Sequence, residues 1–176
     1  MTNQELPDAE RLCEELLRQL EARMPRDAAM IGIVTGGAWL AERLHRELGI
    51  GDPLGVLDVS FYRDDFDKKG LHHHVKPSRI GFDVQDRHIV LVDDVLFTGR
   101  TVRAAMNEIF DYGRPARIEL AVLADRGGRE LPISAQYVGG TVSVPQGSIL
   151  VLDRGEGGRG LTLRVSQQRR SRSPAA

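Results

Sequence analysis

The stretch that most constrains the fold spans residues 88–101 and reads HIVLVDDVLFTGRT. Residues 89–92 are apolar and mostly β-branched, which is typical of a strand buried on both faces of a parallel sheet. Two acidic residues, Asp93 and Asp94, follow, and a short loop leads into the segment 101–112, whose apolar residues fall on one helical face. A buried strand, a short loop and an amphipathic helix are consecutive parts of a βαβ unit, so the stretch predicts an α/β fold.

The same alternation of strand and helix continues along the chain. A first helix is predicted from the N-cap Asp8 to about Arg23, and a second ends at Gly49. Further strands are predicted at 30–35, 56–63, 118–124, 149–152 and 161–165. This order predicts right-handed βαβ connections and a mainly parallel central sheet flanked by helices. Residues 64–79 are polar and lack apolar periodicity, so we expect a long mobile loop there.

Length and composition fit a single domain over residues 1–166, followed by a basic, disordered tail at 167–176. The net charge of −1 gives no global attraction to nucleic acid or anionic lipid. We find no signal pattern and no apolar run long enough for a membrane, and the single cysteine, Cys13, cannot form an internal disulfide. These features favour the cytoplasm. Cys13 lies on the apolar stripe of the first helix, where we expect it to be buried and unreactive.

The acidic pair lies where a ligand is expected. Ligands bind at the carboxyl edge of parallel sheets, and the N-terminus of the helix near Thr101 offers amides to a phosphate. Thr98 and Thr101 add hydroxyl groups, and Gly99 allows close approach of the backbone. Carboxylates beside a phosphate pocket suit a phosphorylated ribose, which carries both hydroxyls and phosphate. The alternative is a capped strand–helix turn with solvated acids.

Several segments carry a family resemblance. Residues 89–101, IVLVDDVLFTGRT, resemble the phosphoribosyl pyrophosphate (PRPP) signature of type I phosphoribosyltransferases. Residues 60–66, 101–116 and 120–133 resemble the PyrR family, which are pyrimidine-operon attenuation regulators that also act as uracil phosphoribosyltransferases. The likeness covers about residues 28–140. It implies a type I phosphoribosyltransferase fold, with a small hood formed by the N-terminal helix and the C-terminal part.

The resemblance also implies roles for particular residues. Asp93 and Asp94 would hold the ribose hydroxyls, and Arg63 would neutralise the departing pyrophosphate; these three are the expected catalytic residues. Mg²⁺ would come with PRPP rather than sit in a dedicated protein cage. Substrate binding is expected at Thr35, Gly36, Gly37, Val95, Leu96, Phe97, Thr98, Gly99, Arg100, Thr101, Arg126 and Gly127.

The implied reaction is that of a pentosyltransferase, in which uracil and PRPP give UMP and pyrophosphate. Its transition state is oxocarbenium-like, so positioning and charge stabilisation matter more than a covalent nucleophile. The loop at 64–79 would close over the site. Oxopurine enzymes carry an aspartate where Phe97 stands, so Phe97 argues against hypoxanthine and guanine. The glycine-containing loop at 125–129 would read uracil.

This chain departs from the family pattern at two positions. The first phosphate loop of the family often reads Lys-Thr-Arg-Gly, whereas this chain has Val34, Thr35, Gly36 and Gly37. The missing arginine removes a charge-assisted contact to pyrophosphate, which predicts low activity. Gly128 stands where some members have a histidine linked to RNA binding, which argues against RNA binding here.

Other functions compete with this hypothesis. The first alternative is a nucleotide-sensing or RNA-binding regulator with little catalytic activity, which would bind UMP and a pyrimidine-operon leader mRNA. A phosphoacceptor receiver domain and a P-loop ATPase are disfavoured by the position of the acidic pair and by the lack of a GxxxxGK[ST] motif. Residues 72–74, three histidines, invite a metal site but favour a solvated loop. The apolar face of the first helix favours a homodimer or a larger homo-oligomer.

Overall fold

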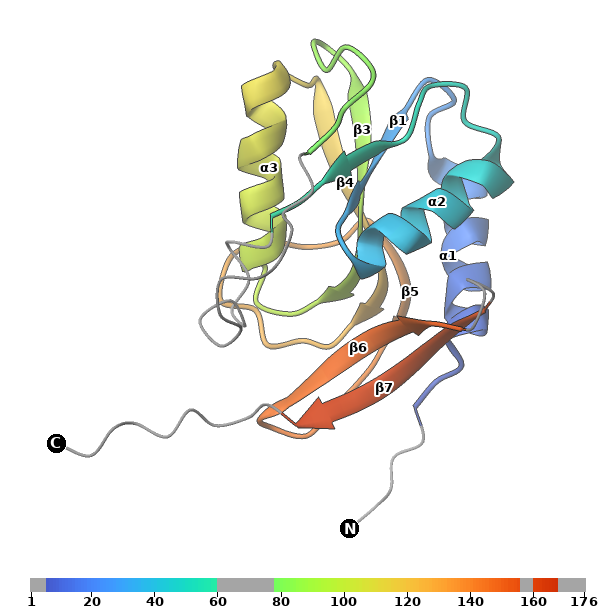
Figure 1. The fold of residues 1–176 in the computed structure, drawn as a ribbon, viewed down its shortest axis with the longest axis vertical. Coiled ribbons are helices and arrows are strands. Elements are labelled where there is room, and N and C mark those ends of the chain that lie inside the picture. The colour runs from blue at the N-terminus through green and yellow to red at the C-terminus, as the bar shows by residue number, and fades with distance from the viewer. Residues whose placement is uncertain (1–5, 60–77, 156–159, 168–176) are drawn as a thin grey trace, which may run out of the picture.

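The computed structural model describes residues 6–59, 78–155 and 160–167. Five parallel strands form one sheet in the order β2-β1-β3-β4-β5, and β6 and β7 form an antiparallel hairpin (Figure 1). This architecture confirms the predicted α/β fold. The elements are α1 (Ala9–Arg23), β1 (Ala29–Ile33), α2 (Gly36–Leu48), β2 (Gly55–Leu57), β3 (His88–Leu96), α3 (Arg100–Tyr112), β4 (Arg117–Asp125), β5 (Tyr137–Thr141), β6 (Ser148–Arg154) and β7 (Leu161–Gln167).

Strand β3 lies at the centre of the sheet, and helices cover both of its faces. Helices α1 and α2 lie on one face and α3 on the other (Figure 1). Because side chains alternate along a strand, Val90 and Val92 join the core under α1 and α2, whereas Ile89 and Leu91 join the core under α3. The apolar run at 89–92 is therefore buried in two separate cores, as its composition predicted.

Helix α1 begins where the sequence predicted. The Asp8 side chain accepts a hydrogen bond from the Glu10 amide at 2.8 Å, which is an N-cap. Its apolar face packs on β4 and β5, and burial raises the pKa of the Cys13 thiol to about 11. Cys13 is therefore buried, as predicted, and protonated at neutral pH. The apolar face lies in the chain's own core and so gives no support to the predicted oligomer, which stays a prediction.

Several predicted boundaries were wrong. Strand β3 does not end before the acidic pair but continues to Leu96, because β4 offers partners as far as Asp125. Strand β1 ends at Ile33 rather than Thr35. Strand β2 has three residues and ends at Leu57, opposite the last residue of β1, and residues 60–63 of the predicted strand lie outside the described residues. Gln167, the first residue of the predicted tail, is instead the last residue of β7.

Some predictions fall outside the described residues. They concern Arg63, the histidines at 72–74 and most of the loop at 64–79. At the end of that loop, Arg79 pairs with Val56 through two backbone hydrogen bonds of 2.8 and 2.7 Å.

The hairpin β6–β7 lies across the carboxyl ends of the parallel strands (Figure 1). A third apolar cluster joins it to the sheet, with Leu150 of β6 packed against Ala124 and Val142. Of the two segments expected to form a hood, the C-terminal part does so, whereas α1 contacts β7 but packs mainly on the sheet. None of the described helices is long and apolar enough to cross a membrane.

A buried polar cluster closes the opposite, amino end of the sheet. The Glu119 carboxylate accepts hydrogen bonds from the Tyr137 hydroxyl at 2.7 Å and pairs with His88 at 3.0 Å and with Arg117 at 2.7 Å. Burial alone would raise the pKa of Glu119, but Tyr137, His88 and Arg117 outweigh it and hold the pKa below its ordinary value. Burial and the nearby carboxylate raise the pKa of Tyr137 to about 12. The cluster thus joins the starts of β3, β4 and β5.

We predict that Glu119→Gln lowers the free energy of unfolding by about 2 kcal/mol at pH 7, because hydrogen bonds to a charged group are lost. A group with a lowered folded pKa stabilises the fold above its unfolded pKa and loses that effect as the pH falls through the folded pKa. The difference between wild type and variant should therefore persist at pH 5–7 and shrink below about pH 4. Urea titrations across this range measure it. Glu42→Gln, which removes an exposed pair with Arg154, is the control, and an equal loss there would contradict the prediction.

Candidate phosphoribosyl site

A cavity of about 100 Å³ lies at the carboxyl edge of the sheet, between the loop after β3 and strand β6. It contains eight of the residues that the sequence predicted for the site: Asp93, Val95, Leu96, Phe97, Thr98, Gly99, Thr101 and Arg126. Three further residues complete its lining: Val102, Ile149 and Leu150. The sequence showed that 149–152 is strand-like, but no local signal placed that strand over the site.

The floor of the cavity leads into the N-terminus of α3. Gly99 is the N-cap residue with φ +92°, and it has no side chain to occupy the amides of the first turn. A Cβ at this position would lie 2.9 Å from Ile133, so the turn requires glycine. Thr98 is buried, and its hydroxyl accepts a hydrogen bond from the Arg100 amide at 3.2 Å. These amides and hydroxyls form a pocket that suits a phosphate group.

The two carboxylates of the acidic pair are buried, with Asp93 2% and Asp94 8% exposed. Oδ1 of Asp93 accepts a hydrogen bond from the Asp94 amide, and Oδ1 of Asp94 accepts one from the Val95 amide, both at 2.9 Å. Asp93 lines the cavity, whereas the carboxylate of Asp94 lies against Gly36 at the start of α2. The pair is thus held in a defined orientation beside a helix N-terminus, where negative charge is stabilised.

Thr35, Gly36 and Gly37 form the N-terminus of α2, as predicted, at the same edge of the sheet. Thr35 is the N-cap residue and makes no side-chain cap, and the two glycines are the first residues of the helix. The peptide bond between Val34 and Thr35 is cis. These three residues do not line the cavity but adjoin it through the acidic pair. Two helix N-termini, those of α2 and α3, therefore flank the carboxylates and offer two anion sites.

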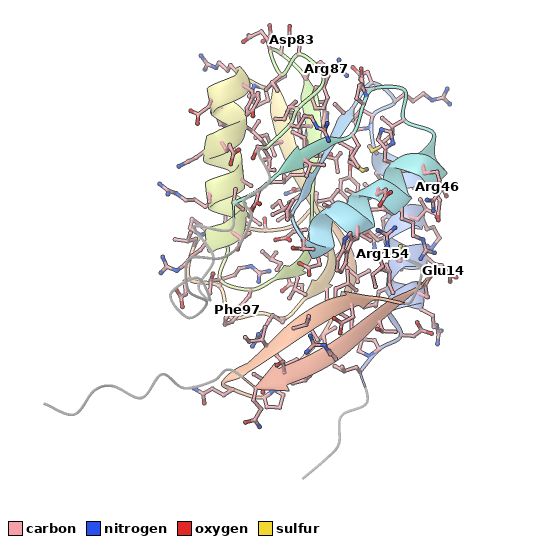
Figure 2. The ribbon with its side chains drawn as sticks, viewed as in Figure 1. Glu14, Arg46, Asp83, Arg87, Phe97 and Arg154 are labelled. Atoms are coloured by element: carbon pink, nitrogen blue, oxygen red, sulfur yellow. The ribbon has the colours of Figure 1, made fainter. Side chains whose placement is uncertain are left out.

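Arg126 and Phe97 both line the cavity. Phe97 lies at the end of the sheet that is next to the hairpin (Figure 2). The Arg126 guanidinium lies 4.0 Å from the centroid of the Phe97 ring, and its Nη1 donates to the Ser148 carbonyl at 2.9 Å. Its Nε is buried and has no hydrogen-bond partner among the described residues. Burial lowers the pKa of Arg126. A buried donor without a partner at a cavity wall is suited to an acceptor atom of a ligand.

Other residues of the loop at 125–129 bind one another and neighbouring backbone, which fixes the conformation of the loop. Asp125 pairs with Arg129 and accepts a hydrogen bond from the Gly127 amide at 2.9 Å. Burial would raise the pKa of Asp125, but these partners outweigh it and lower the pKa. Arg129 also donates to the carbonyls of Phe97 at 2.9 Å and Ile133 at 3.0 Å. Of this loop, Arg126 lines the cavity and Gly127 does not, and the reading of uracil by the loop stays a prediction.

Arg100 is also placed away from the cavity. Its guanidinium binds the Glu130 carboxylate at 2.9 and 2.7 Å, and both side chains are about half exposed. Only its backbone amide, at the start of α3, remains near the predicted phosphate pocket.

Gly128 has φ +73°, and a Cβ there would overlap Cε2 of Phe97 and lie 2.9 Å from Cδ2.

Within the described ranges, no group of three or more histidine, cysteine, aspartate or glutamate side chains is arranged to hold a metal ion. Asp93 and Asp94 nevertheless provide oxygen ligands at the edge of the cavity. Mg²⁺ commonly uses one or two carboxylates together with water and substrate phosphates. The acidic pair therefore fits an Mg²⁺ ion that enters with a phosphorylated substrate.

Comparison with known proteins defines the class. Residues 3–148 match the family described as the phosphoribosyl transferase domain. A hypoxanthine phosphoribosyltransferase from Staphylococcus aureus superposes with a TM-score of 0.59 at 23% identity, covering 80% of this chain and 77% of that chain, which shows the fold. A purine phosphoribosyltransferase from Pyrococcus horikoshii gives a TM-score of 0.56 at 29% identity, covering 76% and 82%. The fold is that of a type I phosphoribosyltransferase.

Curated relatives narrow the class to one family. "Bifunctional protein PyrR" of Ralstonia nicotianae is 51% identical over 162 residues, which cover 89% of this chain and 92% of the relative. The protein of that name in Nitrosococcus oceani is 61% identical over 126 residues, covering 70% and 71%. The chain belongs to the PyrR family, as the sequence motifs predicted.

Proposed function

We propose that this protein is a uracil phosphoribosyltransferase, which forms UMP and pyrophosphate from uracil and PRPP, and that UMP binding to the same site regulates pyrimidine-operon expression. The observation that carries the proposal is the pair of buried carboxylates, Asp93 and Asp94, flanked by two helix N-termini at one sheet edge. A phosphorylated sugar with a second phosphate group matches this arrangement of acceptors and amides.

The chain's own groups divide the work between the two ends of the substrate. Asp93 and Asp94 accept hydrogen bonds from the ribose hydroxyls, while the first turn of α3 and the hydroxyls of Thr98 and Thr101 hold the 5′-phosphate. The amides at the start of α2 receive the pyrophosphate. Arg63 is assigned to the same leaving group by family resemblance and lies outside the described residues. Mg²⁺ bound with PRPP would neutralise charge on the pyrophosphate.

This arrangement stabilises the transition state by charge. As the bond to pyrophosphate breaks, positive charge grows on the ribose carbon and negative charge on the leaving group. Carboxylates already fixed by the Asp94 and Val95 amides need no reorganisation to favour the cationic sugar. Catalysis then depends on positioning and electrostatics, without a covalent intermediate.

The base is expected in the part of the cavity between Phe97, Arg126 and Ile149. The unpartnered Nε–H of Arg126 matches a carbonyl oxygen, of which uracil has two. The exposed ring of Phe97 has no group able to exchange a proton with a purine imidazole. These features support uracil over the oxopurines.

Asp94→Asn should lower kcat/KM for UMP formation by at least about 100-fold, because the variant cannot stabilise developing positive charge. The side chain keeps its size, so the melting temperature should change little. A coupled pyrophosphate assay with Mg²⁺, uracil and PRPP measures the rate. Asp111→Asn, on the exposed end of α3, is the control and should retain full activity. Undiminished activity in Asp94→Asn would reject the role assigned to the acidic pair.

Base selectivity is tested with the same assay. We expect no more than about 1% of the uracil rate with hypoxanthine, since buried polar groups left unpaired strongly disfavour a wrong substrate. Arg126→Met keeps an unbranched apolar stem but removes the donors, and it should raise KM for uracil more than KM for PRPP. Comparable rates with hypoxanthine, or an equal rise in both KM values, would contradict the assignment.

The regulatory half of the proposal has its own test. We expect UMP to tighten binding of the protein to a pyrimidine-operon leader RNA, with the protein acting as a cytoplasmic homo-oligomer. A gel-shift titration at physiological salt, with and without UMP, measures this, because phosphate contacts weaken steeply with salt. A scrambled RNA of equal length is the control. If UMP changes neither the affinity for the leader RNA nor the affinity for the scrambled RNA, the protein is an enzyme without this regulatory role.

A further inference from the structure

Gly36 and Asp94 are in direct steric contact across the site. A Cβ built on Gly36 would overlap Oδ2 of Asp94, and it would lie 2.7 Å from Cγ and 3.0 Å from Cβ of the same side chain. All three nearest atoms therefore belong to one aspartate side chain. Asp94 cannot keep its position if residue 36 carries any side chain.

The neighbouring glycine has a different environment. A Cβ on Gly37 would lie 2.7 Å from the Val92 carbonyl oxygen and 2.8 Å from Cα of Asp93, which are backbone atoms. Gly37 is thus required for the close packing of α2 on β3. At Gly36 the backbone is not the obstacle, and its φ does not lie in the left-handed region that favours glycine. The position of Asp94 is what excludes a larger residue there.

We infer that Gly36 is a positioning residue, whose missing side chain lets the Asp94 carboxylate lie against the N-terminus of α2 in the orientation that binds ribose. This inference rests on the proposed role of Asp94. In that orientation Oδ1 accepts the Val95 amide at 2.9 Å, and Oδ2 lies beside the first turn of α2. Gly36 thus acts on the ribose through Asp94, in addition to any contact of its amide with pyrophosphate.

The experiment measures UMP binding by calorimetry, because UMP has the ribose and the 5′-phosphate but no pyrophosphate. A role limited to pyrophosphate leaves UMP affinity unchanged. Gly36→Ala should weaken UMP binding at least about tenfold, the size of effect expected when a charge-assisted hydrogen bond is lost. Gly51→Ala, at a glycine with no atom within 4 Å of a built Cβ, is the matched control and should bind UMP within about twofold of wild type.

A double-mutant cycle tests whether the effect passes through Asp94. Asp94→Ala removes Oδ2 and Cγ, the two atoms nearest to a Cβ at position 36, and leaves Cβ at 3.0 Å. Adding Gly36→Ala should therefore weaken UMP binding no further, and it should lower the melting temperature less than it does in the wild-type background. Asp94→Asn keeps the shape of the side chain, so in that background Gly36→Ala should still destabilise. Equal losses of UMP affinity in the wild-type and Asp94→Ala backgrounds, or an unchanged affinity of Gly36→Ala, would overturn the inference.

Two outcomes need separate interpretation. If Gly36→Ala does not fold, recovery of folding in the double variant with Asp94→Ala supports the contact, and failure of both proteins to fold contradicts it. If wild type does not bind UMP, the proposed function fails, and the melting temperatures of the cycle still decide whether Gly36 sets the position of Asp94.

Discussion

The structure depends on the burial of β3 on both faces and along both edges. This strand pairs with β1 on one side and β4 on the other, and its apolar residues enter the cores under α1 and α2 and under α3. A strand so constrained has one register, because a shift by one residue would exchange its two buried faces. Asp93 and Asp94 lie on the last part of this strand, so the backbone that carries the site is among the most rigid in the molecule.

Burying two adjacent carboxylates is unfavourable unless their charge is compensated. Here each accepts the amide of the following residue, and both lie beside the N-terminus of α2. Apolar residues at these two positions would pack without the unfavourable burial of charge. The presence of two carboxylates therefore supports a functional rather than a structural role for the pair. Arg126 also carries a cost of burial, because its buried Nε–H has no hydrogen-bond partner within the part of the chain that the structure describes, and an acceptor atom of a ligand would remove that cost.

The two departures from the family pattern are explained by packing against site residues. Gly36, where the resembled family often carries arginine, lies against Asp94, and Gly128, where some members carry histidine, lies against Phe97. Each glycine permits a close approach that a side chain would prevent. The missing side chains are therefore tied to the positions of Asp94 and Phe97, and they are not isolated losses of charge.

The sequence by itself determined the fold class, the family, and most of the residues that line the cavity. It also predicted the described helices and strands in their order, except for β5, Tyr137–Thr141, which it missed. These follow from local patterns: an apolar run, an acidic pair, and a glycine turn before an amphipathic helix. The tertiary structure alone decided that Ile149 and Leu150 close the cavity, that Arg126 and not Gly127 faces it, and that the apolar face of α1 is internal. The reason is physical, because these facts depend on contacts between segments far apart in the chain, and neither periodicity nor spacing encodes which segments meet.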